Sequence, residues 1–141
     1  MLVRLMYASR PTSPGRPEDL AAILRASRNH NPGAGITGLL CCSSEVFLQV
    51  LEGGRHPVNR LYHRIATDPR HQDPILLRYD EIDERSFAGW AMGQIDLARL
   101  NTALLLKYSE SPVLDPYAVS GKVSLALFDE LVATASVNCQ G

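Results

Sequence analysis

The sequence has no apolar run near the roughly 20 residues that a membrane-spanning helix requires. Its first residues lead directly into a strand-like pattern and are too few for the apolar core of a signal peptide. The 14 lysines and arginines almost balance the 15 aspartates and glutamates, for a formal net charge of −1. Nucleic-acid-binding domains usually carry a basic excess. We therefore expect neither a nucleic acid nor a membrane as partner.

Cysteine is scarce, with three residues in the chain. Cys41 and Cys42 are adjacent, and neighbours in a strand point to opposite faces, so they make a poor disulfide pair. This pattern is typical of a reducing compartment, and we expect a cytoplasmic location.

Motifs of the common enzyme classes are also missing. The sequence has no His-Glu-x-x-His, Cys-x-x-Cys or Gly-x-Ser-x-Gly, and no glycine-rich phosphate loop. Gly33, Gly35 and Gly38 are irregularly spaced and precede a strand, unlike a dinucleotide-binding fingerprint. An acylphosphatase-like site would need an arginine-plus-asparagine phosphate cradle at the first strand-to-helix turn, and none is evident. We expect no metal site and interpret the histidines as surface residues: His30, His56, His63 and His71.

The length of 141 residues suits one domain with a single core. Hydrophobic periodicity predicts strands over 2–8, 36–42, 46–51, 74–82 and 91–96. It predicts helices from Pro17 to the breaker Asn31-Pro32-Gly33 and over 57–67, 98–107 and 121–136. The order favours an α+β, ferredoxin-like β-α-β-β-α-β-β sandwich. We expect a mixed five-stranded sheet with two helices on one face and two C-terminal helices on the other.

The strand over 46–51 carries one unexpected polar residue, Gln49. Phe47, Gln49 and Leu51 share one face, and the opposite face is wholly apolar, which indicates a central strand covered on both sides. A buried amide needs partners for its oxygen and its nitrogen. Gln49 is either a structural amide that the backbone satisfies or a residue that faces a ligand. Tyr7 would be its natural neighbour.

Several segments together resemble the BLUF family, the blue-light sensors that use FAD. The likeness covers roughly residues 2–95, and its segments occur in the family's order and spacing. Cys42 and Ala91 depart from residues common in the family, without touching the Tyr7–Gln49 pair. The matching stretches are 4–9, 27–32, 35–40, 47–53, 62–65, 68–71, Phe87 and 90–92. The resemblance implies a flavin-binding core over 1–96 and a C-terminal helical extension over 97–141 that packs on the same sheet, within one domain.

The resemblance also implies a set of site residues. Tyr7 and Gln49 would form the photoactive pair, with Trp90 and Met92 near Gln49 on the fifth strand. Asn31 would hydrogen-bond the flavin ring edge. The remaining cofactor-binding residues would enclose the ring or surround its edge, ribityl chain or phosphates: Ile23, His30, Arg64, Ile65, Asp68, Arg70 and His71. FAD is the expected cofactor, although these residues would tolerate FMN or riboflavin.

The implied mechanism is a photoswitch without catalytic turnover. Tyr7 would give up an electron and a proton through Gln49, which would be left rotated or tautomerised. The altered hydrogen bonds would pass through the fifth strand to the C-terminal helices. The tail resembles short stand-alone members of the PixD type, which implies a homo-oligomer (a dimer or a ring-like decamer) and a response-regulator-like partner, with no effector domain.

The sequence is also compatible with two other functions. A flavin- or phosphate-using enzyme on the same sandwich would need a catalytic base, and no clear candidate is present. A structural or interaction module would have an empty pocket, and the purified protein would stay colourless when flavin is added.

Overall fold

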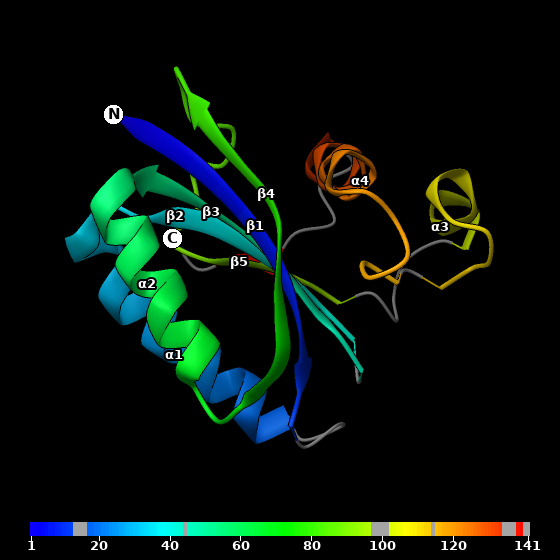
Figure 1. The fold of residues 1–141 in the computed structure, drawn as a ribbon, viewed down its shortest axis with the longest axis horizontal. Helices are drawn as coiled ribbons and strands as arrows, with labels where there is room; N and C mark the ends of the chain where they lie inside the picture. Colours follow the sequence, from blue (N-terminus) through cyan, green and yellow to red (C-terminus); the bar gives the residue numbers. More distant parts are fainter. Residues whose placement is uncertain (13–16, 44, 97–101, 114, 134–137, 140–141) are drawn as a thin grey trace.

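A computed structural model describes the chain except residues 13–16, 44, 97–101, 114, 134–137 and 140–141 (Figure 1). The amino-terminal half alternates strands and helices: β1 (Leu2–Pro11), α1 (Pro17–Ala34), β2 (Thr37–Cys42), β3 (Phe47–Gly54) and α2 (Arg55–Thr67). The remaining elements are β4 (His71–Ile82), β5 (Gly93–Asp96), α3 (Thr102–Tyr108), α4 (Gly121–Ala133) and β6 (Asn138–Cys139).

The strands form one mixed sheet in the order β4-β1-β3-β2-β5-β6. β1 pairs antiparallel with β3 and β4, and β2 pairs antiparallel with β3 through the predicted hairpin. β2 and β5 run parallel. The predicted α+β sandwich and its five strands are confirmed. β6, which pairs with β5, was not predicted because two residues carry too little periodicity to be recognised.

The predicted end of the first helix needs correction. α1 continues through Pro32 to Ala34, and Gly35 then adopts a φ of +70°. A proline in the last turn removes only one helical hydrogen bond, so the helix ends at the glycine, which tolerates left-handed backbone. α4 is described to Ala133 and α3 from Thr102, so the predicted extensions over 134–136 and 98–101 lie outside the described residues.

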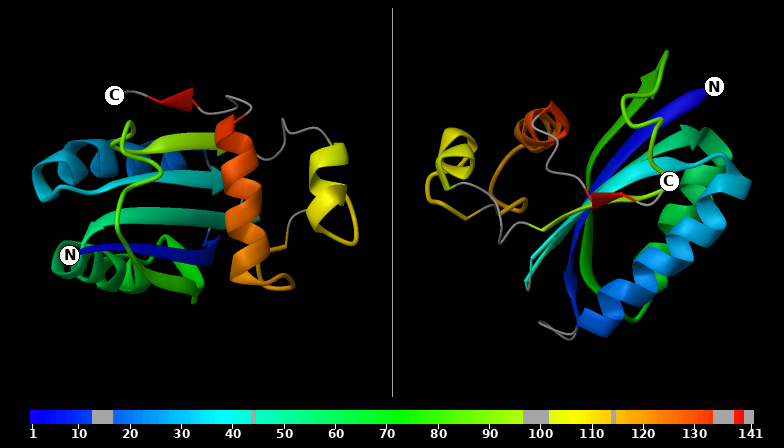
Figure 2. Two further views of the ribbon diagram at one scale, coloured as in Figure 1. Left: turned by 90° about the horizontal axis from the view of Figure 1, so that it is seen from above. Right: turned by 180° about the vertical axis from the view of Figure 1, so that it is seen from behind.

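Helices cover both faces of the sheet, as the views in Figures 1 and 2 show: α1 and α2 lie on one face and α4 on the other. α3 lies beside α4, where Tyr108 Oη donates to Glu130 at 2.8 Å. Each face has its own apolar cluster. The α1/α2 cluster includes Val3, Leu5, Tyr7, Ile23, Leu40, Phe47, Leu51 and Met92. The α4 cluster includes Met6, Leu39, Leu48, Val50, Phe87, Ile95, Leu127, Phe128 and Leu131.

β3 is buried on both faces, as its sequence indicates. Its Glu52 is fully buried and lies on the α4 side, with a salt bridge of 2.8 Å to Arg4 of β1. The same carboxylate accepts hydrogen bonds from the backbone nitrogens of Ser86 and Phe87, at 3.0 and 2.7 Å. Glu52 therefore fixes the connection between β4 and β5 to the sheet. Among the described residues, no helix combines the length and apolarity needed to cross a membrane.

Candidate functional site

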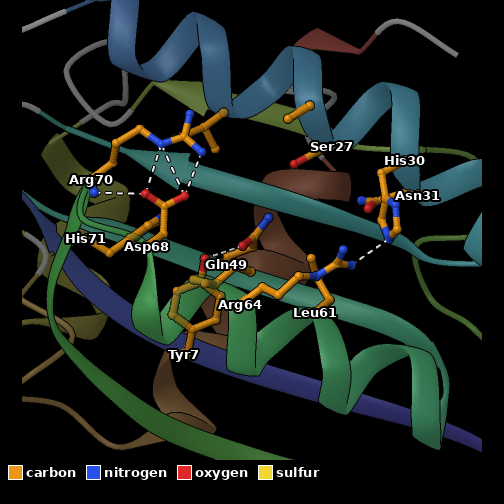
Figure 3. Close-up of a pocket in the computed structure, with 13 residues that line it drawn as sticks. Tyr7, Ser27, His30, Asn31, Gln49, Leu61, Arg64, Asp68, Arg70 and His71 are labelled. Carbon is orange, nitrogen blue, oxygen red and sulfur yellow. Dashed lines mark hydrogen bonds and ion pairs between the residues drawn. The ribbon is translucent and has the colours of Figure 1, made fainter.

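A cavity of about 320 Å³ lies between α1 and α2, over the face of β1 and β3 (Figure 3). Ten residues singled out from the sequence line it: Tyr7, Ile23, His30, Asn31, Gln49, Arg64, Ile65, Asp68, Arg70 and His71. Ala26, Ser27 and Leu61 also line it and were not predicted as site residues. Helical spacing could have found them, since Ala26 and Ser27 follow Ile23 by three and four positions, and Leu61 precedes Ile65 by four.

The floor of the cavity is formed by Tyr7 and Gln49, which lie directly opposite each other in the β1–β3 register. The Tyr7 hydroxyl donates a hydrogen bond to Gln49 Oε1, as Figure 3 shows. Gln49 Nε2 donates to the Sδ atom of Met92 at 3.2 Å. Both side chains are almost fully buried. The amide is thus satisfied by two side chains, one an oxidisable phenol and the other a thioether, which is a weak acceptor.

Burial strongly raises the pKa of Tyr7, and the nearby Tyr62 and Asp68 raise it further. Tyr62 packs beside it, with ring centroids 5.3 Å apart. Tyr7 therefore remains a neutral hydrogen-bond donor at any physiological pH.

Asn31 of α1 is completely buried at the edge of the cavity. Its Nδ2 donates to the carbonyl of Ala91 at 3.1 Å, which fixes the orientation of the amide. Its Oδ1 has no hydrogen-bond partner among the described residues. Buried polar atoms are nearly always paired, so this oxygen indicates a ligand that presents an N–H or O–H group.

Charged groups lie at both ends of the cavity. At one end, Arg70 forms a salt bridge of 2.6 Å with Asp68, and its hydrogen bonds lower the pKa of that carboxyl. At the other end, Arg64 donates to His30 Nε2 at 2.8 Å. Figure 3 shows the two pairs on either side of Gln49. The first pair is internally neutral, whereas Arg64 has no acidic partner in the part of the chain that the structure describes.

His71 begins β4 and closes the cavity near Tyr7. It is buried, so its interpretation as a surface histidine is wrong. Its Nδ1 lies 2.7 Å from Ser9 Oγ, and its ring contacts Phe47 with centroids 5.2 Å apart. Burial lowers the pKa of His71, so its imidazole is neutral near pH 7.

Trp90 and Met92 do not lie on the fifth strand as predicted, because β5 begins at Gly93. Met92 faces the α1/α2 side and contacts Gln49. Trp90 instead packs against the α4 cluster, with its ring centroid 6.4 Å from that of Phe87, so Met92 is the one of the two whose side chain contacts Gln49. The course of the main chain before β5 determines where the two side chains point. It is held by a hydrogen bond of 3.1 Å that the carbonyl of Trp90 accepts from Gly38 N of β2.

The arrangement suits a flat, partly polar ring with an attached anionic chain. Ile23 and Ile65 supply apolar contacts from two different helices. Gln49 and Asn31 supply amide groups at its edge, and Arg64 and Arg70 supply cations. The described residues contain no group of three metal-ligating side chains. A flavin fits this donor set.

Comparisons with known proteins agree with this assessment. A family model described as sensors of blue light using FAD (BLUF) matches residues 2–93. The photoactivated adenylate cyclase subunit beta of Euglena longa is 37% identical over 92 residues, 64% of this chain and 11% of that protein. The chain therefore spans about a tenth of that relative's length.

Solved structures extend the similarity to nearly the whole chain. BlrB, a BLUF protein in its dark state, is 32% identical with a TM-score of 0.79, covering 95% of this chain and 96% of that one. BlsA in its photo-activated state is 32% identical with a TM-score of 0.84, covering 94% and 95%. The chain belongs to the BLUF family of blue-light sensors.

Proposed function

We propose that this protein is a blue-light photoreceptor that holds FAD non-covalently in the cavity between α1 and α2. The observation that carries the proposal is the hydrogen-bonded series Tyr7–Gln49–Met92 on the cavity floor. The series couples an oxidisable phenol to an amide whose rotation exchanges the positions of its hydrogen-bond acceptor and donor. Its far end is anchored in the segment that leads to β5.

The residues around the cavity would hold the flavin in different ways. Asn31 Oδ1, unpaired among the described residues, would accept a hydrogen bond from the ring edge. Ile23 and Ile65 would exclude water from the ring faces, which strengthens the hydrogen bonds made there. When bound, the flavin would supply blue-light absorption and an electron acceptor. The cationic groups of Arg64 and Arg70 suit its polar edge or its phosphates.

Tyr7 would supply the electron. Burial opposes formation of a tyrosinate, as its raised pKa shows, so the phenol would release its proton only together with an electron. The acceptor for that proton is Gln49 Oε1, which the hydroxyl already contacts. Return of the electron and proton restores the neutral phenol. The net change is a rotated or tautomerised Gln49, with no reactant consumed, and we propose a photoswitch without turnover.

A rotated Gln49 would disturb Met92. Rotation would bring Oε1 towards Sδ, and neither atom carries a hydrogen to donate. The main chain at Met92 is held on several sides, because Arg28 Nε donates to its carbonyl at 3.2 Å and Asn31 donates to the preceding carbonyl. A shift of Met92 would therefore move this whole segment rather than one side chain.

The segment also reaches the opposite face of the sheet. Phe87 is buried in the α4 cluster and lies 6.4 Å from the Phe128 ring of α4. We propose that α4 and α3, within the C-terminal extension over 97–141, carry the signal to other molecules. The expected contacts are with further copies of this chain, in a dimer or a ring-like decamer, or with a response-regulator-like protein in the cytoplasm.

An absorption spectrum of the purified, flavin-loaded protein tests the proposed function. It is recorded in the dark, immediately after blue light and again after a dark interval. The expected result is a flavin band that moves slightly to the red and returns in darkness. A band that bleaches without recovery, or that never changes, would contradict the photoreceptor assignment.

A further inference from the structure

The three residues that precede β5, from Trp90 to Met92, are held through their main-chain carbonyls. The first carbonyl accepts a hydrogen bond from β2, and the other two accept from side chains of α1. The donors are, in order, Gly38 N, Asn31 Nδ2 and Arg28 Nε, at 3.1, 3.1 and 3.2 Å. α1 therefore positions the main chain at Met92.

Arg28 and Asn31 reach this segment from different surroundings. They lie three positions apart on α1 and therefore project from the same face of the helix. Asn31 is completely buried and lines the cavity between α1 and α2. Arg28 is partly buried and lines a separate surface depression together with Gln94 of β5. Arg28 therefore contacts the segment of the photoswitch from outside the cavity.

The hydrogen bond from Arg28 bears on the position of Met92 before and after light. Before light, Gln49 Nε2 donates to Met92 Sδ while Arg28 holds the Met92 carbonyl. After rotation of Gln49, two atoms that cannot donate would face each other, and Met92 would be displaced. The bond from a charged donor to the carbonyl opposes this displacement. It therefore disfavours the light state and favours the return of Met92.

We propose that Arg28 is a positioning residue of the photoswitch, which holds Met92 in its dark position and so sets the lifetime of the light state. This inference rests on the proposed photoreceptor function. Arg28 acts through the Met92 carbonyl and not through the flavin, because it lies outside the cavity. Loss of its hydrogen bond would therefore slow dark recovery while the light-induced shift is retained.

Two replacements separate the hydrogen bond of Arg28 from its charge. Arg28→Met keeps a long side chain but carries no donor. Arg28→Gln removes the charge, yet its Nε2 donor occupies the same place along the side chain as Arg28 Nε. A role of the hydrogen bond therefore predicts different results for the two variants. Arg25→Met is the matched control, because Arg25 is an exposed cation of α1 that lines the same depression.

The test measures the absorbance recovery of the FAD-loaded full chain in darkness after a blue pulse. Arg28→Met should recover about three- to tenfold more slowly, the effect expected of one partly exposed hydrogen bond from a charged donor. Arg28→Ala, which also lacks a donor, should show the same slowing. Arg28→Gln and Arg25→Met should recover within about twofold of the unmodified protein. The size of the red shift and the flavin affinity should stay the same in all four variants.

Combining Arg28→Met with Met92→Leu tests whether Arg28 acts through Met92. Leucine accepts no hydrogen bond from Gln49, so Arg28→Met should change the recovery rate by less than about twofold in that background. Normal recovery of Arg28→Met, equal slowing of Arg28→Met and Arg28→Gln, or an undiminished effect beside Met92→Leu would overturn the proposal. An unmodified protein without a reversible red shift would instead contradict the proposed function, so the two failures are distinguishable.

Discussion

Gln49 and Met92 are joined by a hydrogen bond of 3.2 Å from Nε2 to Sδ, which links the central strand β3 to the segment preceding β5. The other end of the same amide accepts from Tyr7. Because a thioether can accept but not donate, Met92 favours the amide orientation in which nitrogen faces it. A change in the orientation of the Gln49 amide would therefore alter this hydrogen bond and displace the main chain at Met92.

Met92→Leu should keep the light-induced red shift but slow its dark recovery by about three- to tenfold. The leucine fills a similar volume but leaves Gln49 Nε2 without its acceptor, and an unpaired buried donor costs about 1–3 kcal/mol. Absorbance decay after a blue pulse measures the rate. Met6→Leu, which replaces a buried methionine on the opposite face, is the control and should recover normally. Equal rates in both variants would count against the role of Met92.

Asn31→Ala should weaken flavin binding by about tenfold or more, since it removes both the free acceptor and the group that holds the Ala91 carbonyl. Fluorescence titration of the flavin-free protein measures this affinity. Asn29→Ala, on the exposed side of α1, should bind normally. If Asn31→Ala bound flavin as tightly as the Asn29 variant, the ring edge would have another partner.

Glu52→Ala should lower the free energy of unfolding by about 3–5 kcal/mol, because it leaves the mostly buried Arg4 without its partner. It also removes the acceptor of two backbone nitrogens in the β4–β5 connection. Asp80→Ala breaks the more exposed pair with Arg78 and should change stability by less than about 1 kcal/mol. Urea unfolding measures both, and similar values would mean that Glu52 does not anchor the connection.

Stability should decrease as pH falls from about 7 to 5. The folded-state pKa of His71 lies below its ordinary value of about 6.5, so the unfolded chain takes up the proton first. The negative charge of Asp68 opposes this lowering of the His71 pKa. Because the pKa of Asp68 itself is lowered in the folded state, its protonation reduces stability only below about pH 4. Arg70 reinforces the shift at His71. Urea unfolding of His71→Gln should show a flatter pH dependence, whereas the exposed His56→Gln should keep the original slope.

The sequence predicted the sandwich well because its strands and helices have clear periodicity. Gln49 was identified as a candidate site residue because it is a single polar residue in an apolar strand, and Tyr7 was expected as its neighbour. The register that places the two residues directly opposite each other comes from the structure. The sequence could not predict that Trp90 packs in the α4 cluster while Met92 packs in the α1/α2 cluster. This difference depends on hydrogen bonds between the segment and distant residues such as Gly38. The burial of Glu52 likewise depends on Arg4, which lies on another strand.

The most direct test of the account is the light-minus-dark absorption spectrum of flavin-loaded Tyr7→Phe beside that of Tyr62→Phe. Both replacements remove one hydroxyl, but only Tyr7 donates to Gln49. The account predicts a bound flavin without a reversible red shift in Tyr7→Phe and a normal shift in Tyr62→Phe. A normal reversible shift in Tyr7→Phe would contradict the role of the Tyr7–Gln49 pair as the photoswitch.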